Sequence, residues 1–300
     1  MEYVVQQLLN TLSIGGNYAL LALGLAIVFS VIGLVNFAYG EVIAVAGYVM
    51  FAVFAIGGID YALVLMPIGV LAAVVISVTL ERVAFRPVRY APAATGLLTA
   101  FGVSILIKNF FITIVATRSK SVPTPAWLAH QIDIGIARIQ VIQLLETTVT
   151  AIALLLLLLI LRRTNIGLAM RAAARDFDMV RMVGINANKV IAAAFAVSGF
   201  LAGLAAIFII ARRGVVDPFM GFTPVLKAFV AAVLGGFGSL GGAVVGGFLL
   251  GALEVFFQLV LPPSIAGYRD AFVFVLVAAI LVWRPQGLVG TKRQFGDKDE

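Results

Sequence analysis

The chain has 300 residues, of which 62% are hydrophobic and only 12% charged, and its net charge is +7. A mean hydropathy of +1.12 excludes an ordinary soluble globular domain. The absence of cysteine excludes disulfides and thiolate metal sites, and a single histidine, His130, excludes a cluster of histidine ligands. The sequence therefore predicts no metal site. We expect its positive charge on the cytoplasmic side of a membrane, not against nucleic acid.

Apolar runs of about 20 residues recur along the chain, and such a run crosses the roughly 30 Å hydrocarbon layer as one helix. The predicted spans are 5–32, 42–59, 62–81, 96–116, 143–161, 190–211, 223–238, 243–261 and 270–283. Because the seventh is short, 223–250 is alternatively a broken or re-entrant element. The sequence thus predicts an all-α polytopic membrane protein, a single transmembrane domain over residues 1–300 with about eight or nine spans. The N-terminus lacks a basic n-region and a cleavage site, so we expect no removable signal peptide.

Lysine and arginine gather in three segments outside the spans: 82–89, 162–189 and the tail 284–300. With nine crossings all three lie on one side, which the positive-inside rule makes cytoplasmic, and the N-terminus lies outside. Arg212 and Arg213 then lie outside, against the rule, unless they snorkel to the interface. With eight crossings and one re-entrant piece, either the N-terminus moves inside or the late segments change side.

The first polar interruption is GLVNFAYGEV, residues 33–42. A carboxylate at membrane depth costs at least about 2.5 kcal/mol and therefore points to a functional site. One interpretation is an interfacial turn in which Glu41 begins a helix near water. The other is a broken helix whose polar groups line a translocation route. The candidate pathway residues here are Asn36, Phe37, Tyr39 and Glu41.

Other charged side chains inside predicted spans include Lys108, Lys227 and Glu254. Lys227 and Glu254 lie on neighbouring spans, where they are able to pair, but each is also within reach of an interface. Both a pathway role and a structural role stay open for all three.

The longest external segment, 118–142, runs into IDIGIARIQVIQ, which alternates apolar and polar residues. A period of two predicts a strand or hairpin, not a helix. The segment is either a flap over the helix bundle or a docking surface for an external partner.

The segment 162–189 is too polar to cross a membrane. Its apolar residues recur near helical spacing, at Leu168, Met170, Ala174, Phe177, Val180 and Val183. This pattern predicts a short amphipathic helix on the cytoplasmic surface, ended by Gly184. It is either a positive-inside loop against lipid head groups or a helix that docks into a partner.

Eight of the 30 glycines fall within 235–251, which begins GGFGSLGG. Small residues spaced by four let membrane helices approach closely, and this accounts for most of them. The stretch from Gly235 and Gly236 to Ser239 is more typical of a helix break beside a pathway. It lacks the Lys-Ser/Thr pair of a phosphate loop, which excludes nucleotide binding there. No other enzyme signature occurs, so we expect no catalytic residue and no enzyme.

Three segments, in this order, resemble the permeases of branched-chain amino-acid ABC transporters of the LivH type. GLVNFAYGEV resembles the family motif Asn-Phe-Ala-His-Gly-Glu, with Tyr39 where histidine is usual. LRRTNIGLAMRA and RAAARDFDMVRMVGIN resemble the cytoplasmic coupling segment and the run that leads into it. AAVLGGFGSLGGAVVGGFLLGALE, 231–254, resembles the C-terminal glycine-rich motif, with Gly241 where proline is frequent. The resemblance covers nearly the whole chain.

The resemblance implies a multi-pass permease subunit of the bacterial inner membrane that forms a pore with a second permease, identical or related. Two cytoplasmic ATPase subunits would bind ATP and Mg, so no cofactor is expected in this chain, and an external binding protein would deliver the solute. By the resemblance, the ATPase contact comprises Arg171, Arg175, Asp176, Gly184, Ile185 and Asn186.

The solute implied by the resemblance is a branched-chain or related amino acid. The departure at Tyr39 leaves urea and short amides as alternatives. Outside this family, the alternative is an ion-coupled secondary transporter. Its relay groups would be Glu41, Lys108, Lys227 and Glu254.

Overall fold

The computed structural model describes residues 2–58, 62–89, 91–115, 117–133, 138–175, 177–182 and 184–289. Within these ranges, eight helices are long and apolar enough to cross a membrane. They are α1 (Glu2–Ile32), α2 (Tyr39–Gly57), α3 (Ala62–Leu80), α4 (Ala93–Ile114), α5 (Val141–Arg163), α8 (Ala187–Arg213), α10 (Leu240–Val260) and α11 (Arg269–Trp283). The all-α polytopic fold predicted from hydropathy is confirmed.

Shorter elements connect these helices. The helical ones are the π-helical turn η1 (Glu81–Phe85), η2 (Ala126–Ala129), α6 (Asn165–Ala173), α7 (Phe177–Met182), α9 (Phe222–Gly235) and η3 (Ala266–Tyr268). Strand β1 (Lys120–Ser121) pairs antiparallel with β4 (Val215–Val216). Strand β2 (Gln131–Asp133) pairs antiparallel with β3 (Arg138–Gln140), with Ile132 opposite Ile139. The hairpin predicted in the external segment is confirmed, although α5 begins at Val141, two residues earlier than predicted.

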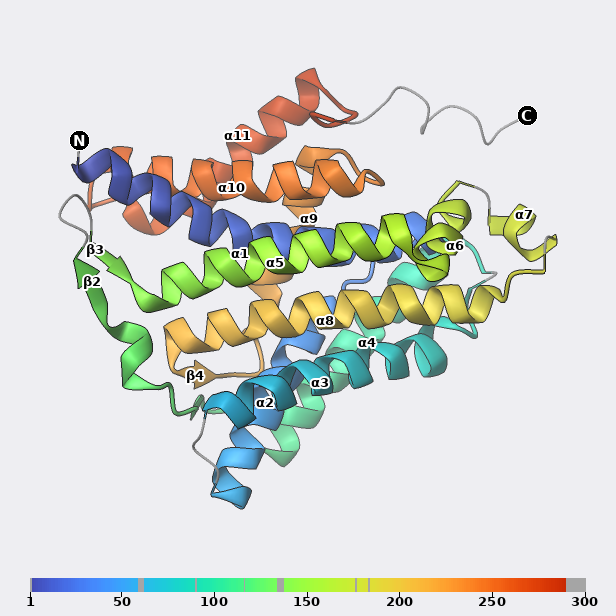
Figure 1. The fold of residues 1–300 in the computed structure, drawn as a ribbon, viewed down its shortest axis with the longest axis horizontal. Coiled ribbons are helices and arrows are strands. Elements are labelled where there is room, and N and C mark those ends of the chain that lie inside the picture. The colour runs from blue at the N-terminus through green and yellow to red at the C-terminus, as the bar shows by residue number, and fades with distance from the viewer. Residues whose placement is uncertain are drawn as a thin grey trace.

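Helix α1 lies at the centre of the bundle and packs against α5, α8, α9 and α10 (Figure 1). Close approach depends on small residues: a Cβ on Gly247 of α10 would collide with the backbone at Ala19, and one on Gly251 with Gly15. The packing role predicted for glycines spaced by four is therefore confirmed. Helices α2, α3 and α4 pack on the side of α8 away from α10, and α11 lies at the opposite edge.

Both predicted breaks are present. Helix α1 ends at Ile32 and α2 begins at Tyr39, while α9 ends at Gly235 and α10 begins at Leu240. The 14 residues of α9 span about 21 Å, less than the roughly 30 Å of the hydrocarbon layer. The predicted span 223–238 is thus a shorter helix, preceded by an extended segment that pairs through β4 with β1.

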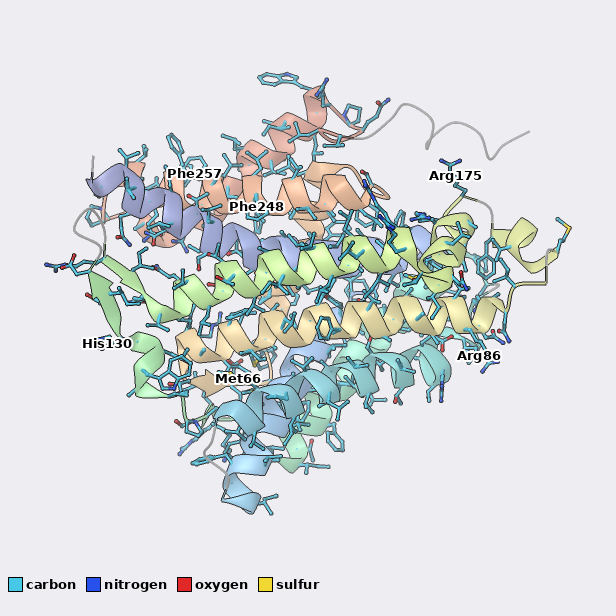
Figure 2. The ribbon with its side chains drawn as sticks, viewed as in Figure 1. Met66, Arg86, His130, Arg175, Phe248 and Phe257 are labelled. Carbon is cyan, nitrogen blue, oxygen red and sulfur yellow. The ribbon has the colours of Figure 1, made fainter. Side chains whose placement is uncertain are left out.

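Arg86 and Arg175 lie at the end of the bundle that carries α6 and α7, and His130 lies at the opposite end beside the hairpin (Figure 2). Arg212, which counts against the nine-crossing arrangement, has a partly exposed side chain whose guanidinium pairs with buried Glu146 of α5.

The prediction of a single amphipathic helix in 162–189 is wrong, because two short helices, α6 and α7, form in this segment. Leu168 is 59% exposed whereas Met170 is 3% exposed. Two residues apart on a helix are about 200° apart around its axis, so the two cannot share one face. The orientation of α6 is set by Gly167, which lies too close to the backbone of Leu161 to carry a Cβ. Val183 lies outside the described residues.

Candidate translocation pathway and coupling segment

The first break lies inside the bundle. Tyr39 is fully buried, and its hydroxyl donates to the backbone carbonyl of Ser198 at 3.3 Å. Ser198 is near the middle of α8, and the Tyr39 ring also packs against Gly24 of α1. At Tyr39 the break therefore lies inside the helix bundle, beside the middle of α8, and not at the surface of the bundle. Tyr39 itself faces the core between α1 and α8.

Glu41 carries a buried charge in the first turn of α2, where the helix dipole favours an anion. It is 2% exposed. Its Oε1 accepts a hydrogen bond from Ser104 Oγ at 2.9 Å and lies 3.4 Å from Lys108 Nζ. Within the described part of the chain, its Oε2 and the Oδ1 of buried Asn36 have no hydrogen-bond partner. Two acceptors in one break are thus left without donors.

A continuous series of aromatic rings joins the two breaks. Phe37, in the first break, stacks on Phe101 of α4 at 4.8 Å and lies 5.6 Å from Phe229 of α9. Phe229 lies 5.5 Å from Phe237, in the second break, and Phe237 lies 4.1 Å from Phe29 of α1. The breaks are 200 residues apart in sequence but share one apolar contact region.

The second break is closely packed. A Cβ on Gly235 would collide with the backbone of Gly242, and buried Gly236 has a φ of +110°. Ser239 caps α10 by accepting a hydrogen bond from Gly242 N at 3.1 Å. Packing, backbone conformation and capping account for these three candidate residues, whereas Phe237 is the one that meets the aromatic series.

A groove of about 370 Å³ lies between α2 and α4. Tyr48 and Phe111 line it, with ring centroids 4.0 Å apart, and Lys120 of β1 stands at its outer end. Tyr48 follows Glu41 by two turns of α2, and Phe111 follows Lys108 by one turn of α4. The groove therefore lies on the same two helices as the Glu41–Lys108 pair, and the stacked rings of Tyr48 and Phe111 lie between the two.

The coupling segment contains residues of two kinds. Arg171 donates to the carbonyl of Leu161 and so joins α6 to the end of α5. Asn186 caps α8 by accepting a hydrogen bond from Lys189 N at 3.3 Å. Both residues therefore hold the local fold.

The remaining coupling candidates face outward. The side chain of Arg175 points away from the bundle (Figure 2), and Gly184 and Ile185 are also exposed. Gly184 has a φ of +83°, a conformation that glycine adopts without strain. Asp176 lies outside the described residues.

A second ionic cluster holds the C-terminal helices together. Lys227 Nζ lies 3.1 Å from Glu254 and 3.0 Å from Asp270 of α11, and Arg269 lies 2.8 Å from Glu254. The predicted Lys227–Glu254 pair is confirmed. Tyr18 of α1 donates to Glu254, so the cluster joins α1, α9, α10 and α11. Among the described residues, no three histidine or acidic side chains are grouped to hold a metal ion.

Sequence reasoning missed Phe101, Ser104 and Phe229. Phe101, Ser104 and Lys108 are spaced by three and four residues, so they share one face of α4. The spacing of Ser104 and Lys108 by four residues was visible in the sequence. It also missed the contact of Arg212 with Ser13 at 2.6 Å and with Glu146, which joins α8 to α1 and α5.

The whole chain has recognisable relatives. Residues 7–282 match the model of the family described as the permease component of the branched-chain amino acid transport system. The chain is 35% identical to the high-affinity branched-chain amino acid transport system permease protein LivH of Salmonella typhimurium, over 96% of each chain. It is equally similar to BraD of Pseudomonas aeruginosa, also 35% over 96% of each. It is 25% identical to a probable LivH permease of Methanocaldococcus jannaschii, over 90% of this chain and 88% of that one. The chain therefore belongs to the family of branched-chain amino acid transport system permease components.

Proposed function

We propose that this chain is the inner-membrane permease subunit of an ABC importer and forms the translocation route for branched-chain or related amino acids. The single observation that carries this proposal is the meeting of two helix breaks inside the bundle, joined through Phe229. Non-helical backbone is tolerated at membrane depth only where it is buried in protein or lines a cavity. Here it lies next to a charged pair and a groove, as expected for a route.

The proposed route follows the groove between α2 and α4, passes Glu41 and Lys108, and reaches the ring of Phe37. The rings of Phe37, Phe229 and Phe237 form an apolar constriction between the two breaks. Breaks allow short segments on either side to move without bending a continuous helix. Movement of α9 relative to α2 would therefore open or close the constriction.

The proposed partners follow from the family and from the exposed end of the bundle. A second permease, identical or related, completes the pore, an external binding protein delivers the solute, and two ATPases bind the segment 162–189. Arg175, Gly184 and Ile185 supply the exposed ATPase contact, and Arg171 keeps α6 fixed to α5 so that motion is transmitted. ATP binding then biases a two-state equilibrium of the pore.

Reconstitution tests this proposal. The chain is co-purified with its proposed partners, a second permease, two ATPases and a binding protein, and placed in liposomes, and uptake of labelled leucine and urea is measured. We expect ATP-dependent, binding-protein-dependent uptake of leucine. Uptake of urea alone would transfer the proposal to the amide permeases. Uptake that persists without ATP and collapses with an uncoupler would replace it by an ion-coupled transporter.

A further inference from the structure

The geometry of the Glu41–Lys108 pair is poor for an ion pair whose role is only structural. Its atoms are 3.4 Å apart, longer than a good charge-assisted hydrogen bond, and one oxygen of a nearly fully buried carboxylate has no donor within the described residues. Desolvation cancels much of the attraction of a buried ion pair unless the remaining lone pairs are also satisfied. The arrangement thus leaves capacity for an additional donor at Glu41.

Lys108 is the more exposed member of the pair, whereas Glu41 is 2% exposed. The side chain of Lys108 is 17% exposed, and its ammonium lies 5.1 Å from the ring centroid of Phe222. The groove lined by Tyr48 and Phe111 begins one to two turns farther out on the same two helices. A small solute would have to displace the stacked rings of Tyr48 and Phe111 to pass from the groove to the pair, where a cation and an anion lie side by side.

We propose that Glu41 and Lys108 form a transient subsite for a zwitterionic α-amino acid with an apolar side chain. The ammonium of the solute binds the free oxygen of Glu41, and its carboxylate binds Lys108 Nζ. Each of the four charges keeps a partner throughout the exchange, so no charge is left bare in the low-dielectric interior. The apolar side chain lies against the stacked rings of Phe37 and Phe101.

This inference rests on the proposed function and specifies the chemistry of its solute. A neutral solute such as urea gains nothing from separated opposite charges, and a solute with net charge leaves one member of the pair uncompensated. The subsite therefore selects for a zwitterion during passage. Specificity of capture belongs to the external binding protein.

The decisive variant removes both charges. Glu41→Gln with Lys108→Met leaves no unpaired buried charge, so a purely structural pair would be replaced without harm. The complete reconstituted transporter is used, with assembly and melting temperature recorded. We expect normal assembly and an unchanged melting temperature, but leucine uptake reduced about tenfold through loss of charge-assisted contacts. Wild-type uptake by this double variant would overturn the inference.

Photo-crosslinking locates the subsite independently. A diazirine analogue of leucine is activated on the turning-over transporter, and labelled peptides are identified by mass spectrometry. We expect label on peptides that contain Phe37, Phe101 or Phe222, competed by leucine but not by N-acetyl-leucinamide, which lacks both charges. Equal competition by both compounds, or label confined to other segments, would refute the zwitterion subsite.

Lys120→Met is the matched control, since Lys120 stands at the outer end of the same groove, over the ring of Phe51. We expect leucine uptake within twofold of wild type, as an order-of-magnitude bound for a contact outside the pair. A loss of uptake as large as in the Glu41→Gln/Lys108→Met double variant would mean that the pair is not the recognition site. If the wild-type transporter takes up no amino acid at all, the proposed function fails instead, so the two failures are distinguishable.

Discussion

The guanidinium of Arg212, in the last turn of α8, pairs with the carboxylate of Glu146, which is fully buried in α5. Ser13 of α1 donates to the same carboxylate and also contacts Arg212, so three helices meet at one charge. The charge of Arg212, which the positive-inside rule would place at the other end of the bundle, is thereby paired with a carboxylate inside the protein. We therefore assign Arg212 a role in holding the three helices together.

Removing one member of this pair is expected to be more damaging than removing both. Arg212→Met leaves the Glu146 charge buried without its main partner and should lower the free energy of unfolding by about 3 kcal/mol. Arg212→Met with Glu146→Gln should recover most of that loss. Thermal unfolding of the purified protein in detergent measures both. Equal destabilisation by the single and double variants would contradict the pairing.

Two adjacent glycines of α10 should respond oppositely to alanine. A Cβ on Gly242 would collide with the carbonyl of Gly235, so Gly242→Ala should destabilise by about 1–3 kcal/mol through overpacking. No atom lies within 4 Å of a Cβ on Gly241 among the described residues, and Gly241→Ala should be neutral or slightly stabilising. Melting temperatures of the two variants check this contrast, and similar values would show that α9 and α10 do not approach as described.

Gly184 should tolerate asparagine better than valine. Its φ of +83° suits glycine, is accessible to asparagine and strains a β-branched residue by about 1–2 kcal/mol. We expect Gly184→Val to reduce ATPase co-purification or binding-protein-stimulated ATP hydrolysis several-fold and Gly184→Asn to reduce it less. Equal activity of both variants would argue that the turn before α8 takes no part in coupling.

Arg175 and Arg171 should separate binding from folding. Arg175 is exposed between α6 and α7. Arg175→Ala should therefore weaken association with the ATPases and leave the melting temperature of the isolated chain unchanged. Arg171→Ala removes the donor to Leu161 and should lower that temperature. A loss of stability of about 1 kcal/mol is expected for one hydrogen bond from a charged donor at a partly exposed site. The reverse pattern would exchange the roles assigned here.

Lys227 should be a stability residue. Lys227 contacts both Glu254 of α10 and Asp270 of α11. Lys227→Met removes the shared cation of these two carboxylates and leaves Arg269 as the cation that contacts Glu254. We expect a loss of about 3 kcal/mol. Asp270→Asn, at a more exposed position, should cost less. Detergent unfolding of both variants provides the comparison, and no loss in Lys227→Met would deny the cluster its proposed role of holding α11.

Part of the candidate site was predictable from sequence. Asn36 and Glu41 were marked by a polar interruption between two apolar spans, and Lys108 and Lys227 by their place inside spans, because a charge at membrane depth is costly enough to require a reason. The sequence did not predict that Tyr39 turns toward α8 while Phe37 turns toward α4. These orientations depend on the path of the chain between the two helices, which leaves α1 at Gly33 with a φ of +71°.

By itself, the sequence determined the class of fold, the approximate spans and the family. Hydropathy adds up along a chain and motifs are local, so neither depends on which helices touch. Only the tertiary structure decided which charges meet. Glu41 accepts a hydrogen bond from Ser104, which is 63 residues away in the sequence, and Arg212 pairs with Glu146, which is 66 residues away. Phe229 contacts rings in both breaks, which lie in opposite halves of the chain. These contacts depend on the rotation of each helix about its axis and on its neighbours, which single-chain periodicity does not encode when nearly every face is apolar.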